Sequence, residues 1–193
     1  MRFFYLLLFI CGAWIGVHVE QLERHAAAES VRSQHRIPRS ALALGSEGRR
    51  LLAAAERHDI AVTDDPEKCR DNELLGLYTA GRQHIVLCME KIRSSTGTQA
   101  EYQELLQSVF AHELVHAAQD CQSKAGRDPS LGIPEADLHR LSADALAEVD
   151  HSLRMIGPSR LPRAVRWRQE AEAQALEANP SAVVAALDAV CTA

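Results

Sequence analysis

The stretch that decides the fold is His112-Glu113-Leu114-Val115-His116, an H-E-x-x-H motif. Residues four apart on an α-helix lie on one face, so both imidazoles can reach the same point. A zinc ion binds neutral imidazole nitrogens at about 2.0–2.1 Å. Glu113 follows the first histidine, where a carboxylate can take a proton from water at the ion. The motif therefore predicts one Zn²⁺ ion with His112 and His116 as ligands and Glu113 as general base.

The residues around the motif predict a long helix that turns the histidines inward. Thr98 and Glu101 form a capping box at its start, and Gly126 and Pro129 end it. An alternative is an ordinary amphipathic helix with two exposed histidines. The histidines continue an apolar stripe, however, and inward-facing imidazoles need a partner, which favours a metal. The stripe recurs at helical spacing through Tyr102, Leu105, Leu106, Val109 and Phe110.

A catalytic zinc usually has three protein ligands, and the third must come from another element. Gln119 and Gln122 occupy the places where a nearby glycine and third histidine would stand. We predict Glu148, on a helix expected over residues 134–156, as the third ligand, with His151 as its main competitor. The residues expected around these ligands are Asp144 and His151 on the face of Glu148, and Asp120 as a brace for His116.

Composition and patterning predict an α+β, mainly α, fold. Apolar residues make up 47% of the 193 residues and aromatic residues only 5%, which favours packed helices. Segments 77–79 and 84–88 form a predicted β-hairpin, and 60–63 a short strand. Further helices are expected over 46–58, 161–177 and 181–190. The net charge is −5 and no basic patch with interleaved aromatics is present, so nucleic acid is not an expected partner.

The N-terminal stretch predicts attachment to a membrane. Residues 3–19 are nearly all apolar and of marginal spanning length, which indicates an anchor or a secretory signal. Residues 20–45 are expected to be a linker or juxtamembrane helix, and residues 46–193 the folded domain. Arg2 precedes the apolar run, which favours export of the domain to the periplasmic or extracytoplasmic side. The domain would be secreted if the segment is cleaved.

The cysteines that follow the apolar run are disulfide candidates. Four cysteines in an exported domain fit two disulfides with three connectivities, and the pattern left those connectivities open. Their spacing is not that of a zinc ribbon. The four residues are Cys69, Cys88, Cys121 and Cys191.

Several runs of residues, in order and at similar spacing over about 69–192, resemble a known family. H-E-L-V-H-A followed by D-C is more specific than H-E-x-x-H alone. The family is that of the mitochondrial inner-membrane metalloproteases and ATP-synthase assembly factors. The runs are Gly76-Leu-Tyr, His84-Ile-Val-Leu-Cys88, His112-Glu-Leu-Val-His-Ala117, Asp120-Cys121, Ala147-Glu148-Val149, Asn179-Pro180 and Ala189-Val190-Cys191.

The resemblance implies a minimal zincin-like, gluzincin-type zinc endopeptidase that works on protein or peptide substrates, membrane proteins among them. It carries over His112, Glu113 and His116, and the family's downstream glutamate maps on Glu148. The chain departs from the family at Asp150 and Leu146, where arginine and cysteine are usual, and it has fewer cysteines. Its clear N-terminal apolar segment indicates a bacterial-type anchored relative.

Family members also act without proteolysis. The alternative function is therefore a non-catalytic assembly factor for membrane proteins, built on a helical scaffold that zinc and disulfides stabilise. A third hypothesis is a soluble helical domain without a metal.

Overall fold

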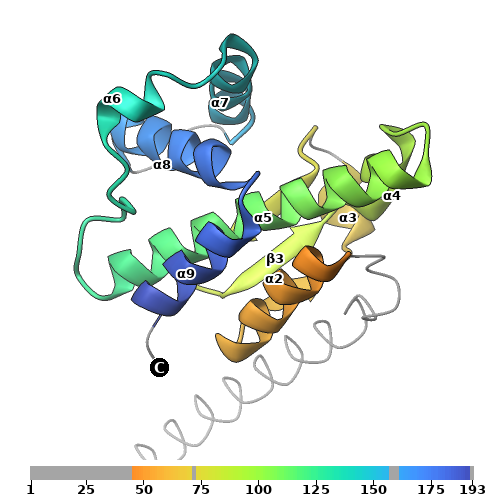
Figure 1. Ribbon diagram of the computed structural model, residues 1–193, viewed down its shortest axis with the longest axis horizontal. Coiled ribbons are helices and arrows are strands. Elements are labelled where there is room, and N and C mark those ends of the chain that lie inside the picture. The colour runs from red at the N-terminus through yellow and green to blue at the C-terminus, as the bar shows by residue number, and fades with distance from the viewer. Residues whose placement is uncertain (1–44, 71–72, 157–160, 192–193) are drawn as a thin grey trace, which may run out of the picture. The chain divides into compact units, whose positions relative to one another are not determined.

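The computed structural model describes residues 45–70, 73–156 and 161–191 (Figure 1). These residues belong to one of the two units into which the chain divides, Ile37–Ala193. The predicted anchor over 3–19 lies outside the described residues, as does the predicted linker except for Gly45. Among the helices that are described, none is both long and apolar enough to cross a bilayer.

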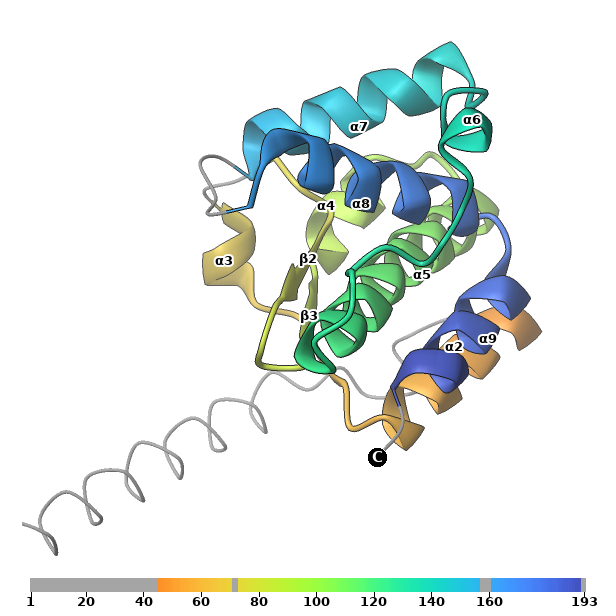
Figure 2. The same cartoon turned by 90° about the vertical axis from the view of Figure 1, so that its left-hand side faces the viewer.

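Helix α5, Gln99–Lys124, runs through the middle of the domain and carries the H-E-x-x-H motif (Figures 1 and 2). The predicted capping box is confirmed. The Thr98 hydroxyl accepts from the Glu101 backbone N–H at 3.2 Å, and the Glu101 carboxylate accepts from the Thr98 N–H at 3.0 Å. These bonds satisfy two N–H groups that the first helical turn leaves unpaired. Gly126, in the left-handed region at φ 70°, takes the chain out of the helix.

A three-stranded sheet packs against α5, with strand order β1-β3-β2. Strand β1, Ala61–Thr63, runs parallel to β3, His84–Leu87, and β2, Gly76–Thr79, pairs antiparallel with β3 in the register Gly76↔Leu87. The hairpin and the short strand predicted from sequence are thus confirmed. All residues of β3 are buried because it lies between the other strands, whereas β2 lies at the sheet edge beside α5.

The main core lies between the sheet, α5 and two helices from opposite ends of the domain. Helix α2, Ser46–Arg57, packs on α9, Pro180–Val190, and both contact α5 (Figure 1). The short helix α4, Met89–Ser94, adds Ile92 to this core. Asn179 caps α9, and Pro180 occupies its first turn, where a missing N–H costs nothing. The fully buried side chains include Leu51, Phe110, Leu114 and Leu187.

Helices α6 to α8 form a second, smaller apolar cluster. Helix α7, Ala143–Met155, packs along α8, Arg163–Leu176, and the short α6, Glu135–Leu138, contacts α8 as well (Figure 2). The prediction of a single helix over 134–156 is wrong, because the helix is interrupted between α6 and α7. Ser142 caps the new helix by accepting from the Ala145 N–H at 3.1 Å, so a capping serine inside the predicted helix marks the break.

Two disulfides are present, as the cysteine count predicted. Cys69, on helix α3 (Pro66–Arg70), bonds to Cys88 just after β3, and Cys121 near the end of α5 bonds to Cys191 after α9. The first joins residues 19 apart and the second residues 70 apart. The first therefore ties α3 to the end of β3, and the second ties the end of α9 to α5, the helix that carries the motif.

Gly76 is expected to be intolerant of a side chain. A Cβ at this position would lie 2.7 Å from both Val109 Cγ1 and Glu113 Oε1. Gly76→Ala should therefore lower the free energy of unfolding by about 1–3 kcal/mol through overpacking. Urea unfolding measures this, and Gly97→Ala is the control because its nearest atom, Glu101 Oε2, lies at 3.4 Å. Equal stability of the two variants would contradict the close approach of β2 to α5.

Candidate metal centre

Two histidines and one glutamate from two helices meet at one point between α5 and α8. His112 Nε2 and His116 Nε2 are 3.2 Å apart. The Glu170 carboxylate of α8 lies 3.5 Å from each of these nitrogens. Within the described ranges, this is the one group of three or more potential ligands that could hold a metal ion.

The Nδ1 atom of His112 is occupied, which fixes the role of its other nitrogen. It lies 2.9 Å from Glu177 Oε2, just past the end of α8. A carboxylate only accepts, so Nδ1 carries the hydrogen. The Glu177 carboxylate is held by Ser108 and Gln174, which donate to its other oxygen at 3.0 and 3.1 Å. In the neutral ring, the lone pair is therefore on Nε2, which faces the other two groups.

His116 is fixed in the same tautomer by an amide. Its Nδ1 lies 2.9 Å from Gln119 Oε1. The Gln119 amide nitrogen donates to the Gln169 carbonyl at 3.0 Å and to the Glu172 carboxylate at 3.2 Å, both of which only accept. The amide oxygen must therefore face His116, and His116 Nδ1 must donate. Because Gln119 and Glu172 are buried, this orientation is held inside the protein.

The geometry that results fits a tetrahedral cation. Bonds of about 2.05 Å to a tetrahedral ion place two ligand atoms about 3.3 Å apart. The two imidazole Nε2 atoms, 3.2 Å apart, lie close to this value. Glu170 approaches His112 with Oε2 and His116 with Oε1, each at 3.5 Å, and one ligand atom from each of the three residues lies within 4.8 Å of the others. Two lone pairs and a carboxylate facing one another also repel unless a cation lies between them. The donor set, two imidazoles and one carboxylate, is one that divalent transition-metal ions bind.

The pKa values of the three groups indicate that positive charge is stabilised at this point. Burial lowers the pKa of His112, but hydrogen bonds to Glu170 and Glu177 outweigh it and raise the pKa to about 10. Burial likewise lowers the pKa of His116, but the charge and hydrogen bond of Glu170 outweigh it, so the pKa of His116 is raised. The two histidines hold the pKa of Glu170 well below its usual range, against the effect of burial. Protons or a metal can supply this charge, and a metal takes the place of the protons.

Glu113 lies beside the triad, buried between α5 and β2. Its side chain fits there because Gly76 has no Cβ, and the backbone of Tyr78 hydrogen-bonds to its carboxylate. Burial raises the pKa of Glu113, and the attraction of His116 and His112 offsets this only in part. A carboxylate with a raised pKa next to a cation site can accept a proton at neutral pH.

A cavity of about 490 Å³ opens onto the triad, within the size range of ligand sites. The edge strand β2 and helix α5 form one side, and α8 with the end of α7 forms the other. His112, Glu113, His116 and Glu170 all line it.

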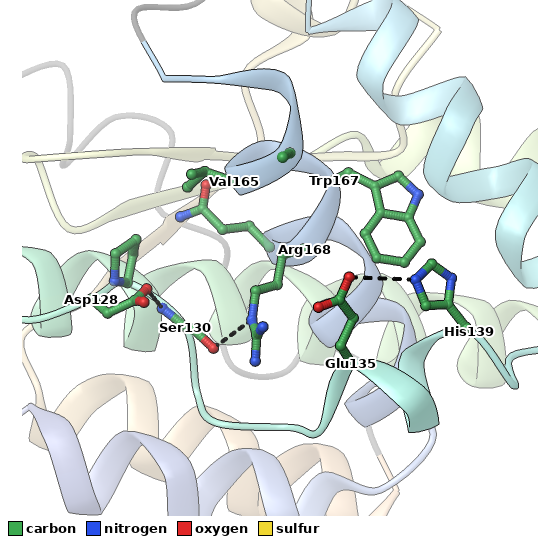
Figure 3. A pocket seen from close by; sticks show the side chains of 10 residues that line it. Asp128, Ser130, Glu135, His139, Val165, Trp167 and Arg168 are labelled. Atoms are coloured by element: carbon green, nitrogen blue, oxygen red, sulfur yellow. Dashed lines mark hydrogen bonds and ion pairs between the residues drawn. The ribbon is translucent and has the colours of Figure 1, made fainter.

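A second cavity, of about 380 Å³, lies on α8 (Figure 3); it shares Pro129, Val165 and Gln169 with the first cavity, but no triad residue lines it. The Trp167 indole stacks on the His139 ring at 4.9 Å, and Glu135 lies 3.6 Å from His139. Arg168 donates to the Ser130 hydroxyl at 2.8 Å. Its polar groups thus pair with one another rather than converging on a common point.

The predicted third ligand, Glu148, is not part of the triad, whose third member is Glu170. Glu148 is exposed on α7. The prediction placed it on a helix directly after the motif helix. In the structure α7 packs on the outer side of α8, so α8 lies next to α5 and supplies the carboxylate.

The residues predicted around the ligands also lie elsewhere. Asp144 is exposed, and His151 lies 4.0 Å from Glu73. Asp120 does not brace His116, which is held by Gln119 instead. It accepts from the Tyr78 hydroxyl at 2.8 Å and from the Gly81 N–H at 2.9 Å, so it fixes the β2–β3 hairpin on α5.

Sequence reasoning missed Glu170, because its burial depends on the packing of α8 against α5. The run Glu170-Ala171-Glu172-Ala173 is buried throughout, with both glutamates 5% exposed or less. Alternating alanines allow close packing of α8 on its neighbours, which buries the acids between them. A buried glutamate requires a partner.

Comparison with known proteins gives a family but no function. Residues 41–192 match the model of a domain family of unknown function, DUF8637, and the chain therefore belongs to this family. No curated protein matches the chain. No solved structure matches it either.

Glu170→Gln is expected to lower the affinity for Zn²⁺ or Co²⁺ strongly, because an amide replaces the charged ligand. Glu148→Gln, an exposed change of the same chemistry, should leave the affinity unchanged. Competition with a chromophoric chelator measures the dissociation constant of the metal for each variant. Loss of affinity in the Glu148 variant instead would reverse the assignment.

Gln119→Met should reduce metal affinity by about 10- to 100-fold, as for other residues that orient a ligand. The substitution removes the acceptor that keeps His116 in its Nδ1–H tautomer. Nitrogen-15 NMR of the imidazoles should show the tautomers mixing in the metal-free protein. Gln103→Met, at an exposed position on α5, is the control. An unchanged tautomer together with unchanged affinity would exclude this role.

Proposed function

Since the family to which this chain belongs is one of unknown function, we propose from the site itself that the protein is a zinc-dependent endopeptidase. The observation that carries the proposal is the convergence of His112, His116 and Glu170, whose ligand atoms lie within 4.8 Å of one another, with Glu113 buried beside them. Two histidines on one helix, a glutamate from a later helix and a neighbouring edge strand support a zincin-like arrangement of the gluzincin type.

In this proposal the edge of β2 holds the substrate. Leu75 O accepts from Cys88 N at 2.9 Å, so the backbone groups of alternate residues point toward β3. Those of Gly76 and Tyr78 then point away from β3, toward the side of Glu113. A peptide can add to such an edge in extended form, which brings one of its carbonyl groups to the triad.

A bound zinc ion would supply Lewis acidity to the peptide carbonyl and to the attacking water. Glu113 accepts the proton of that water as the oxygen attacks the carbonyl carbon. It then donates the proton to the nitrogen of the departing amine, so the carboxylate is regenerated. Burial raises the pKa of Glu113, which favours its acceptance of the proton from water. Glu177 and Gln119 keep the two imidazoles oriented throughout.

The location that we propose is the exported side of a membrane, with residues 3–19 as the attachment. Two disulfides support this proposal, because such bonds persist in oxidising compartments.

Glu113→Gln should retain zinc and lose hydrolysis of an unfolded protein by about 10²- to 10⁴-fold, the usual contribution of general acid–base catalysis. Release of a self-quenched dye from the labelled substrate measures the rate, and metal analysis measures zinc. The control is again Glu148→Gln, which should cleave normally. A fully active Glu113→Gln protein would rule out the catalytic role of this carboxylate.

The same variant separates the endopeptidase from the non-catalytic assembly factor. That alternative needs the metal and the disulfides only to hold the scaffold. It predicts that Glu113→Gln supports assembly of a membrane protein in full whereas His112→Ala does not.

A further inference from the structure

The cavity at the triad has one apolar side. This side contains large apolar side chains that are exposed to solvent, which is unusual in this protein. In the part of the chain that the structure describes, only two large apolar side chains are exposed, Ile156 at 46% and Leu161 at 45%. Both line this cavity. Large apolar side chains left in water next to a cleft mark a binding surface.

Two half-buried side chains extend the apolar side, Leu74 before β2 and Val165 on α8. Leu74 is distant in sequence from the other three residues, which lie at the end of α7 and the start of α8, and all four line this cavity. The charged cavity residues Glu113 and Glu170 lie instead at the triad, Glu170 as one of its members and Glu113 beside it. The cavity therefore has a polar region where a bond can be hydrolysed and an apolar region where a side chain can be buried.

Desolvation disfavours a charged side chain in the apolar region. Besides the triad and Glu113, the charged residues that line the cavity are Arg166 and Asp120, whose charges are opposite. A charged side chain of either sign would lose hydration against Ile156 and Leu161. An uncharged, bulky apolar side chain avoids this penalty.

We propose that Leu74, Ile156, Leu161 and Val165 form a subsite for a large apolar side chain of an extended peptide, and that the substrates carry such a residue close to the scissile bond. This inference rests on the proposed function. The peptide lies along the edge of β2, where alternate side chains of an added strand point to the same side. One of them enters the apolar region while the backbone lies at the triad.

The test uses two peptides that differ at one position, leucine against the near-isosteric asparagine. Zinc-loaded full chain should cleave the leucine peptide with a kcat/KM about 10- to 100-fold higher, the range that one apolar contact supplies. In Ile156→Asn/Leu161→Asn the preference should fall below about 3-fold with zinc content unchanged. Ala147→Asn, exposed on α7 and outside the cavity, is the control and should keep the full preference.

Binding of the same peptides to the Glu113→Gln protein, measured by fluorescence anisotropy, separates the two proposals. Discriminating binding without hydrolysis by the unaltered chain would uphold the subsite and remove the endopeptidase. Equal cleavage and equal binding of both peptides would overturn the subsite and leave the endopeptidase. A fall in molecular mass on Ile156→Asn/Leu161→Asn, with no change in peptide preference, would reassign the surface to self-association and overturn it as well.

Discussion

The constraint on which the site depends is that two imidazole lone pairs and a carboxylate face one another inside the protein. Each group is fixed from behind: His112 by Glu177, His116 by Gln119, and Glu170 by the packing of α8 on α5. Orientation is therefore established by hydrogen bonds that do not involve a metal. A site of this kind is preorganised, so the binding free energy of an ion is not spent on ordering its ligands.

Packing of small residues makes this convergence possible. The alanines around Glu170 and Glu172 allow α8 to lie close to α5, and Gly76 allows β2 to approach the other side of α5. Helix α5 is consequently covered on several sides, which explains why its apolar residues do not form a single narrow stripe. The buried acids of α8 remain tolerable because each has partners: Glu170 has the histidines, and Glu172 has Ser130, Leu131 and Gln119.

Local signals made much of this fold predictable. The Thr98 capping box, the hairpin around Gly81 and the Asn179-Pro180 helix start are each encoded within a few residues, and all three are present. The pair His112 and His116 was predictable for the same reason, since helical spacing alone puts them together. Glu170 was not, because its place depends on which of two later helices packs against α5. Ser142 caps a separate helix, α7, which packs on α8 with Glu148 exposed, and neither pattern nor resemblance revealed that tertiary choice.

The Cys121–Cys191 bond also bears on how the third ligand stays available. It joins the end of α5 to the end of α9, so the segment that carries Glu170 is held to the histidine helix at both of its ends. If α8 detaches during local unfolding, its carboxylate remains within a closed loop and keeps a high effective concentration at the imidazoles. Departure of Glu170 from an ion would then be followed by intramolecular recapture, as with a chelating ligand. Reduction of this disulfide would leave Glu170 tethered through the backbone on one side only and would lower that effective concentration.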